Sequence, residues 1–243
     1  MSAGTHVWQV AIGSGAGSGI DPERLLSAAE IERARHMRGT RRETYVLSHA
    51  AARLILAAHH GADPARIRWT DGRHGKPGMV HGASAGAGNP RSSRSSWSLS
   101  HSGRWAMVAV GGDAPIGVDV LDTSLVTRAE RIARRYFTPD EVRQVERMST
   151  ASARRTACAR LLSRREACVK AAGGTLFQSL KIDASRTGKV HGPHGALHGC
   201  RWHLLDLAGP PGYVAALAAL DRSPVPVVQR LWSWPPKESW GGA

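Results

Sequence analysis

The order of predicted helices and strands repeats along this chain, and the repeat constrains its fold more than any other feature. Residues 6–12 alternate as a strand, and residues 41–60 carry apolar side chains at helical spacing. Three short apolar runs at 97–101, 105–110 and 116–121 then predict a meander of strands. The first part of the chain therefore places helices before strands.

The same order returns after a break near Gly111, Gly112 and Asp113. Thr138-Pro139-Asp140-Glu141 is a helix start, and a longer helix is expected over 152–172, ending at Gly173-Gly174. Strands are expected again at 201–207 and 213–220. Two similar α+β halves are the simplest architecture with this order. The division predicted is 1–112, 113–222 and a Pro/Trp-rich tail at 223–243, laid across the surface.

The charge of the chain is strongly positive and unevenly placed. The net charge is +14 over 243 residues, and residues 128–165 hold 11 arginines against four acidic residues. Such a surface attracts nucleic acid, acidic proteins or phosphorylated small molecules. The spacing of a zinc finger, ribonucleoprotein motif or KH loop is absent, so charge alone does not select among these partners.

The remaining composition predicts a soluble cytoplasmic protein. No apolar run approaches the roughly 18 residues of a membrane span, and the first residues lack the pattern of a signal peptide. Three cysteines without CxxC spacing argue against a disulfide scaffold or structural zinc. A soluble chain of this size can bury a substantial core.

Three motifs suggest a binding or catalytic site, but their sequence context does not support one. The glycine-rich segment 13–19 does not match the GxGxxG register of a dinucleotide loop, so a flexible linker is the better interpretation. His191, His194 and His198 lie in a Gly/Pro-rich segment with no visible supporting ligands. Ser100 and His101 are adjacent on a strand and point to opposite faces, which does not suit a nucleophile and its base.

A more informative set joins Asp119, on a strand, to Glu166 and Lys170, on a helix. Glu166 and Lys170 are four residues apart and share one helical face. Either this is an ordinary ion pair or, in a largely buried helix, the charges serve a purpose. Two carboxylates from separate elements, with cations nearby, are able to bind Mg²⁺ that completes its shell with water and substrate phosphates.

The order of short motifs along the chain resembles the 4′-phosphopantetheinyl transferases of the surfactin (Sfp) type. The resemblance spans roughly residues 20 to 220, and five motifs in the family's order carry more weight than any one of them. The motifs are Gly75-Lys76-Pro77, Trp97-Ser98-Leu99-Ser100-His101-Ser102-Gly103, Pro115-Ile116-Gly117-Val118-Asp119-Val120, Tyr136-Phe137-Thr138-Pro139-Asp140-Glu141 and Arg165-Glu166-Ala167-Cys168-Val169-Lys170.

This resemblance implies Mg²⁺- or Mn²⁺-dependent transfer of the phosphopantetheine arm of coenzyme A to a serine of an apo carrier protein, with release of 3′,5′-ADP. It implies two pseudosymmetric helix-plus-sheet halves with the ligand cleft between them. Asp119 and Glu166 match the metal ligands, and Glu166 and Lys170 match catalytic positions. Further matches to positions that bind coenzyme A are Arg33, Arg53, Lys76, Ser100, His101, Arg165 and Lys170.

The sequence departs from the family pattern at three positions. Leu121 replaces the third carboxylate of the metal strand, Leu162 replaces a tryptophan, and Arg165 replaces a lysine. Because Mg²⁺ often binds through one or two carboxylates, we expect retained activity with altered metal affinity or preference. The alternatives are an inactive homologue or a basic module that binds carrier proteins or nucleic acid.

The resemblance also implies the partners. Carrier proteins of peptide, polyketide or fatty-acid synthases are acidic, and an arginine-rich face would steer their encounter. No nucleic acid and no membrane are expected as partners. A chain with both halves fused should act as a monomer in the cytoplasm.

Overall fold

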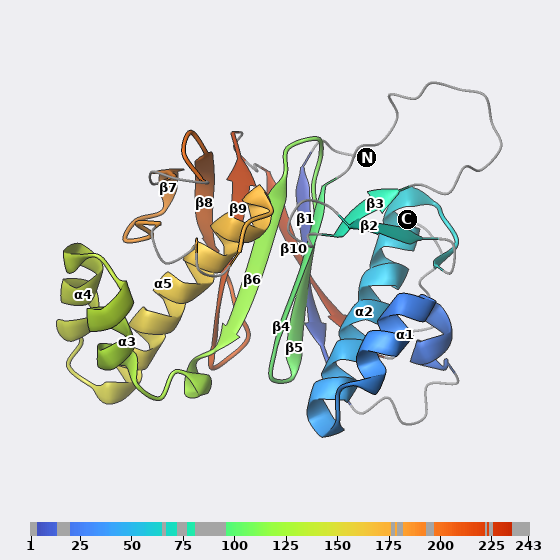
Figure 1. The fold of residues 1–243 in the computed structure, drawn as a ribbon, viewed down its shortest axis with the longest axis horizontal. Helices are drawn as coiled ribbons and strands as arrows, with labels where there is room; N and C mark the ends of the chain where they lie inside the picture. Colours follow the sequence, from blue (N-terminus) through green and yellow to red (C-terminus); the bar gives the residue numbers. More distant parts are fainter. Residues whose placement is uncertain are drawn as a thin grey trace.

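In the computed structural model, two sheets lie side by side in the centre of the molecule and helices cover their outer faces (Figure 1). The structure describes residues 4–13, 20–64, 67–71, 77–80, 96–175, 178, 182–192, 197–221, 223 and 226–234. The glycine-rich segment 13–19 falls almost wholly outside these ranges, and Lys76, His194 and residues 235–243 lie outside them. The α+β class with two sheets is confirmed.

The first half contributes three strands of a four-stranded sheet. Its order is β10-β1-β5-β4, with β1 and β4 both antiparallel to β5. A separate antiparallel pair, β2-β3, lies beside it. The elements are β1 (Thr5–Ala11), the 3₁₀ turn η1 (Pro22–Leu25), α1 (Ala28–Arg35), α2 (Gly39–His60), β2 (Arg68–Asp71), β3 (Pro77–Val80), β4 (Trp97–Ser102) and β5 (Trp105–Val110).

The second half repeats this arrangement. Its antiparallel sheet has the order β6-β9-β8-β7, in which β6-β9-β8 corresponds to β1-β5-β4. The elements are β6 (Ile116–Asp122), η4 (Thr123–Leu125), α3 (Ala129–Tyr136), α4 (Pro139–Glu146), α5 (Ala151–Ala172), β7 (Gly188–His191), β8 (Arg201–Leu207) and β9 (Tyr213–Leu220).

Two predictions about strand placement were wrong. The apolar run at 116–121 does not continue a meander, because β6 pairs with β9 and forms the edge of the second sheet. Part of the predicted surface tail forms strand β10 (Val227–Ser233), which pairs in parallel with β1. Trp232 and Trp234 are buried in the core of the first half, and this burial holds the returning strand in place.

Helix ends follow local sequence rules. Ser27 and Glu30 form a capping box at the start of α1, and Thr138 and Glu141 form one at the start of α4. The two long helices, α2 and α5, each have 22 residues and end on a left-handed glycine, Gly61 or Gly173. The predicted helix over 152–172 is confirmed within one residue.

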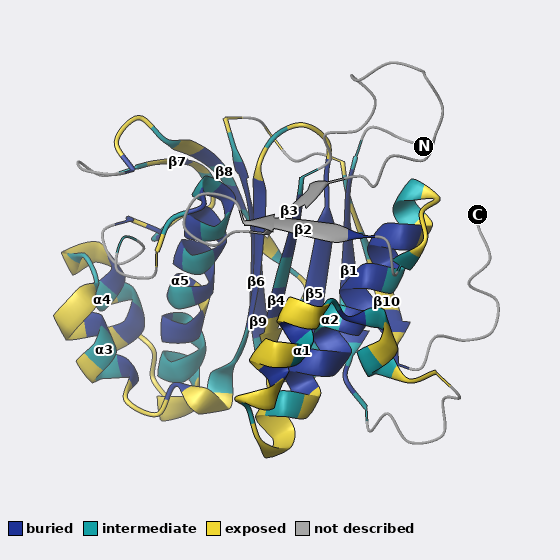
Figure 2. Ribbon diagram, turned by 45° about the vertical axis from the view of Figure 1, so that its right-hand side comes forward, coloured by how far each residue is buried: buried dark blue, intermediate teal, exposed yellow. Residues whose placement is uncertain are grey.

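The core has layers that match this topology. One apolar cluster joins α2 to the first sheet, a second joins the two sheets, and a third joins α5 to the second sheet. Figure 2 shows α2 and the central strands mostly buried, while α1 and α3 expose their outer faces. Within the described residues, no helix has both the length and the apolar composition needed to cross a membrane.

Candidate functional site

A glycine lets the long helix of the second half approach the edge strand. A Cβ atom on Gly117 of β6 would lie 2.1 Å from the carbonyl oxygen of Ala167 and 2.5 Å from the backbone nitrogen of Ala171, both on α5. No side chain fits at such distances, so only glycine permits this packing. The close approach places Glu166 and Lys170 of α5 beside Asp119 of β6.

Asp119 is the centre of the resulting cluster. Its Oδ1 accepts a hydrogen bond from Lys170 Nζ at 2.7 Å and another from Ser100 Oγ at 2.8 Å. Lys170 Nζ also donates to the carbonyl oxygen of Val118 at 3.3 Å. Asp119 is 7% exposed, so its charge is held by these fixed partners rather than by bulk water.

These side chains open into one pocket at the junction of the two sheets. The cavity has a volume of about 540 Å³ and takes its walls from β4, β6 and α5. Its residues are Leu99, Ser100, His101, Ser102, Asp119, Val120, Leu121, Leu162, Glu166 and Lys170. The pocket thus brings together predicted residues from both halves of the chain.

Glu166 is half-buried in this pocket, and its proton affinity is unusual. Burial and then the negative charge of Asp119 raise the pKa of Glu166, and Lys170 offsets only part of this effect. Each carboxylate disfavours ionisation of the other, so a cation between them would stabilise the ionised pair. A raised pKa also suits a carboxylate for accepting a proton near neutral pH.

His101 lines the pocket from the first half. The residue is exposed, but desolvation by the surrounding protein and then the electrostatic effects of His49 and Lys170 lower the pKa of its imidazole to about 4. The imidazole is therefore neutral at pH 7. Arg41 adds further positive charge close to the ring, so this wall is suited to an anionic ligand.

The described residues fit a metal held by two carboxylates. Asp119 and Glu166 line one pocket and would be its two carboxylate ligands, whereas the third position expected from the family pattern is Leu121. Among the residues that the structure describes, no group of three or more His, Cys, Asp or Glu side chains is placed to hold a metal ion. Mg²⁺ at this place would need water and ligand phosphates to complete its octahedron.

Two residues predicted to bind coenzyme A instead stabilise the core. Arg53 is 1% exposed and donates to Glu30 and to the carbonyl oxygens of Pro64 and Ile67. It does not line the pocket, because its guanidinium is buried among these partners.

Arg165 is also fully buried, and it too lies outside the pocket lining. It pairs with Glu141, donates to the carbonyl oxygen of Ile182 at 2.8 Å and lies over the ring of Phe137. Its neighbour Glu166 faces the pocket because adjacent helical residues point about 100° apart. Arg33 is exposed on α1 and does not line the pocket either.

Some contributors to the site had weak signals in the sequence. Gly117 precedes Asp119 by two residues, but only the packing of α5 shows why it must be glycine. Serines at every second position from Ser96 to Ser102 were an available pattern, and the structure shows that they face β6. His49 and Arg41 approach His101 from α2, which no local pattern indicated.

The fold and the pocket define a class: an α+β protein of two repeated halves with a pocket of charged side chains between them. Residues 115–218, which include β6, α5 and β9, match the family model of the 4′-phosphopantetheinyl transferase superfamily. This segment, less than half of the chain, is therefore similar to that superfamily of transferases.

Two similar proteins carry the name of the same activity. The Synechocystis sp. protein slr0495, named provisionally as a 4′-phosphopantetheinyl transferase, is 29% identical over 153 residues, which cover 62% of this chain and 58% of that protein. The 4′-phosphopantetheinyl transferase HetI of Nostoc sp. is 25% identical over 219 residues, covering 90% of this chain and 88% of that protein.

Proposed function

We propose that this chain transfers the 4′-phosphopantetheine arm of coenzyme A to a serine of an apo carrier protein and releases 3′,5′-ADP, as in enzymes of the surfactin type. The observation that carries the proposal is the shared pocket of Asp119, Glu166, Lys170 and His101. A binding module has no need to keep two coupled carboxylates and a lysine at one cavity wall.

The reaction is a displacement at phosphorus. The carrier serine oxygen forms a bond to the phosphorus that bears pantetheine, and the bond from that phosphorus to the bridging oxygen breaks, its electron pair leaving with 3′,5′-ADP. Glu166, whose pKa is raised, orients the serine hydroxyl and accepts its proton. Lys170 directs N–H groups to Asp119 and Val118, and its third N–H is available for a pyrophosphate oxygen.

Asp119 and Glu166 would hold the metal, Mg²⁺ or Mn²⁺. A metal ion in this place neutralises phosphate oxygens and so lowers the barrier to attack. Leu121 leaves the site with two carboxylates. Since water and phosphate oxygens are able to fill the remaining positions, we expect transfer to persist with altered metal affinity or preference.

The first half supplies the wall for the nucleotide end of coenzyme A. His101 lines the pocket and the Arg41 guanidinium lies close enough to influence it, so this wall attracts anions, and Lys76 is proposed to join them. Neutral His101 donates one hydrogen bond to a phosphate. On this scheme residues 1–112 and 113–222 are two functional units of one monomeric cytoplasmic enzyme.

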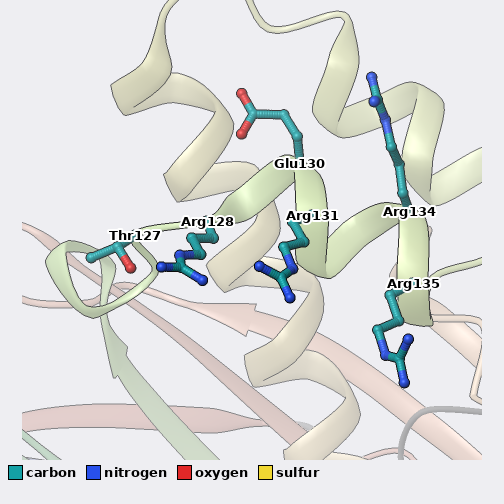
Figure 3. Close-up of a pocket in the computed structure, with 6 residues that line it drawn as sticks. All are labelled: Thr127, Arg128, Glu130, Arg131, Arg134 and Arg135. Carbon is teal, nitrogen blue, oxygen red and sulfur yellow. The ribbon is translucent and has the colours of Figure 1, made fainter.

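A second cavity, lined by arginines, supports an acidic carrier protein as the partner. It has a volume of about 710 Å³ and lies along α3 and the two residues before it. Figure 3 shows Arg128, Arg131 and Arg135 projecting from one side of this segment, with Glu130 pointing to the other. Glu130 is paired with Arg154, so its charge is compensated elsewhere.

This arginine-lined cavity is connected to the pocket through apolar packing. Leu121 and Leu162 line the pocket and also pack against the cluster that contains Ala129 and Ala133 of α3. A carrier bound along α3 would therefore lie near the pocket. Complementary charge would speed the encounter.

The direct test is to incubate the protein with Mg²⁺, coenzyme A and apo carrier proteins, and to weigh each carrier by mass spectrometry. We expect the mass of one phosphopantetheine to be added. Glu166→Gln should reduce transfer by about 100-fold or more, the scale of losing a general base. His101→Ala should raise the KM for coenzyme A more than it lowers kcat.

Three outcomes would contradict this assignment. Coenzyme A that binds without any adduct on several carrier types would favour an inactive homologue. Full transfer by Glu166→Gln would remove the metal and base roles. An unchanged affinity for coenzyme A in His101→Ala would remove the nucleotide wall.

The docking surface has its own test. Arg131→Glu/Arg135→Glu should raise the KM for the carrier by about 10-fold at low salt and by less at high salt, because the encounter is electrostatic. The matched control is Arg186→Glu/Lys189→Glu, which changes the net charge equally at exposed positions elsewhere. Equal effects of both pairs would mean that overall charge, rather than α3, attracts the carrier.

A further inference from the structure

A row of serines joins the two sheets. Hydroxyl oxygens of β4 and the residue preceding it accept hydrogen bonds from backbone N–H groups of β6, each from the residue 20 positions later. The pairs and their Oγ–N distances are Ser96–Ile116, 2.9 Å, Ser98–Val118, 3.0 Å, Ser100–Val120, 3.4 Å, and Ser102–Asp122, 3.0 Å. This serine row replaces the backbone pairing that would otherwise link two parallel strands.

The pattern has a simple physical cause. β4 is the edge of the first sheet and β6 is the edge of the second. β6 pairs with β9 on one side, so its alternate N–H groups point to the other side and need acceptors. Side chains repeat every two residues along a strand, so a serine at every second position meets each of these N–H groups.

Ser100 differs from the other members of the row. It accepts from Val120 N–H and also donates its own hydrogen to Asp119 Oδ1 at 2.8 Å. A hydroxyl has one hydrogen to donate, so that hydrogen is committed to the carboxylate. Ser100 is 6% exposed, which keeps competing water away from the bond.

The hydrogen bonds of Asp119 define which of its oxygens faces a ligand. Ser100 and Lys170 both donate to Oδ1. Within the described part of the chain, Oδ2 is the oxygen that these two donors leave for a cation. A carboxylate held from one side in this way presents its second oxygen in one orientation. Binding a cation there costs little further side-chain entropy.

We propose that Ser100 is a positioning residue for the metal: it holds Asp119 so that Oδ2 faces the cation. The serine row fixes the position of β6 relative to β4, and so places Asp119 beside Ser100. This rests on the proposed function. It differs from the role implied by the family resemblance, in which Ser100 contacts coenzyme A.

The experiment compares Ser100→Ala with Ser98→Ala. Both substitutions remove one acceptor for a β6 N–H, but only the first removes a donor to Asp119. Binding of Mn²⁺ is measured by electron paramagnetic resonance with coenzyme A at saturation, and transfer is measured against Mg²⁺ concentration. Circular dichroism and thermal unfolding check that both variants fold.

We expect Ser100→Ala to bind Mn²⁺ about 10-fold more weakly, the scale seen when a ligand loses its supporting hydrogen bond. Its kcat should recover at high Mg²⁺, and its KM for coenzyme A should change less than about twofold. Ser98→Ala should lose similar thermal stability and keep the wild-type Mn²⁺ affinity.

Two results would overturn the inference. In one, Ser100→Ala weakens coenzyme A binding and leaves Mn²⁺ affinity unchanged. In the other, Ser98→Ala weakens Mn²⁺ binding as much as Ser100→Ala does, which would make the effect a general loosening of β6. A wild-type protein that binds Mn²⁺ and coenzyme A without transferring would reject the proposed function, while the two variants would still decide the role of Ser100.

Discussion

The two halves of this protein contain the same buried ion pair, a clamp between a helix-capping glutamate and an arginine of the long helix. In the first half, Glu30 caps α1 and also pairs with buried Arg53 of α2. In the second, Glu141 caps α4 and also pairs with buried Arg165 of α5. Each arginine further donates to backbone carbonyl oxygens beyond its helix. The clamp thus belongs to the scaffold and explains why these arginines do not line the pocket.

The halves differ where the chemistry is proposed. The fourth residue of β6 is Asp119, whereas the fourth residue of β1 is Trp8. The residue after the buried arginine is Glu166 in α5 and Leu54 in α2. One scaffold thus carries charged side chains in one copy and apolar ones in the other, which shows that the repeated fold does not itself dictate a site.

The largest expected effect comes from breaking the clamps. Arg165→Leu should lower the free energy of unfolding by about 3–5 kcal/mol, because Glu141 is left buried without its positive partner and keeps hydrogen bonds only from Thr138 and the backbone N–H of Ala184. Arg53→Leu should cost less, since Glu30 keeps a hydrogen bond to His49 Nδ1 at 2.9 Å. Urea titration of both variants measures the difference.

A double variant, Arg165→Leu/Glu141→Leu, controls for lost volume. We expect it to recover part of the loss, because a pair replaced by apolar side chains leaves no unpaired charge. Equal losses for Arg53→Leu and Arg165→Leu would show that His49 contributes nothing and that the two clamps are energetically the same.

The next effect tests the close packing that only the second half has. β1 carries His6 where β6 carries Gly117. Gly117→Ala should cost about 1–3 kcal/mol through overpacking against α5, and transfer should fall because Glu166 and Lys170 are displaced. Gly112→Ala, with no atom within 4 Å of the added Cβ, is the control. Unchanged stability and transfer in Gly117→Ala would contradict the packing argument.

The smallest effect is a difference in pH dependence. Burial would raise the pKa of Glu30, but hydrogen bonds from His49, Ser27 and Arg53 outweigh it and hold the pKa well below its ordinary value. A lowered pKa contributes stability above the unfolded pKa, near 4.3, and this stability is lost as pH falls through the folded value. Glu30→Gln should therefore be less stable at pH 7 and show a flatter loss of stability in acid.

The pKa of Glu166 is shifted in the opposite direction from that of Glu30. Its pKa is raised, so its contribution to stability is present below the unfolded pKa and is lost as pH rises through the folded value. At pH 7, which is above the unfolded pKa, this raised pKa costs stability. Glu166→Gln should therefore raise Tm at neutral pH while transfer is lost. Scanning calorimetry from pH 3 to 8 compares the Tm of the two variants with that of the wild type. Changes in Tm of the same sign at neutral pH would contradict the predicted difference between the halves.

Local patterns predicted a large part of the fold. The helix from 152, the helix start at Thr138 and the strands at 201–207 and 213–220 agree with the structure. They could be predicted because capping and periodicity depend on residues a few positions apart. The strand at 116–121 was also found, but its partner was wrong because pairing depends on residues about 100 positions away.

The sequence by itself determined some of the helices and strands, among them α5, β8 and β9, and, through the four-residue spacing of Glu166 and Lys170, which two charges share one face of α5. Tertiary structure alone decided that Arg53 and Arg165 are buried, that β10 returns to β1 and that Ser100 holds Asp119. The physical reason is that spacing along a chain defines direction within one element, whereas burial and hydrogen-bond partners are defined by what packs against it.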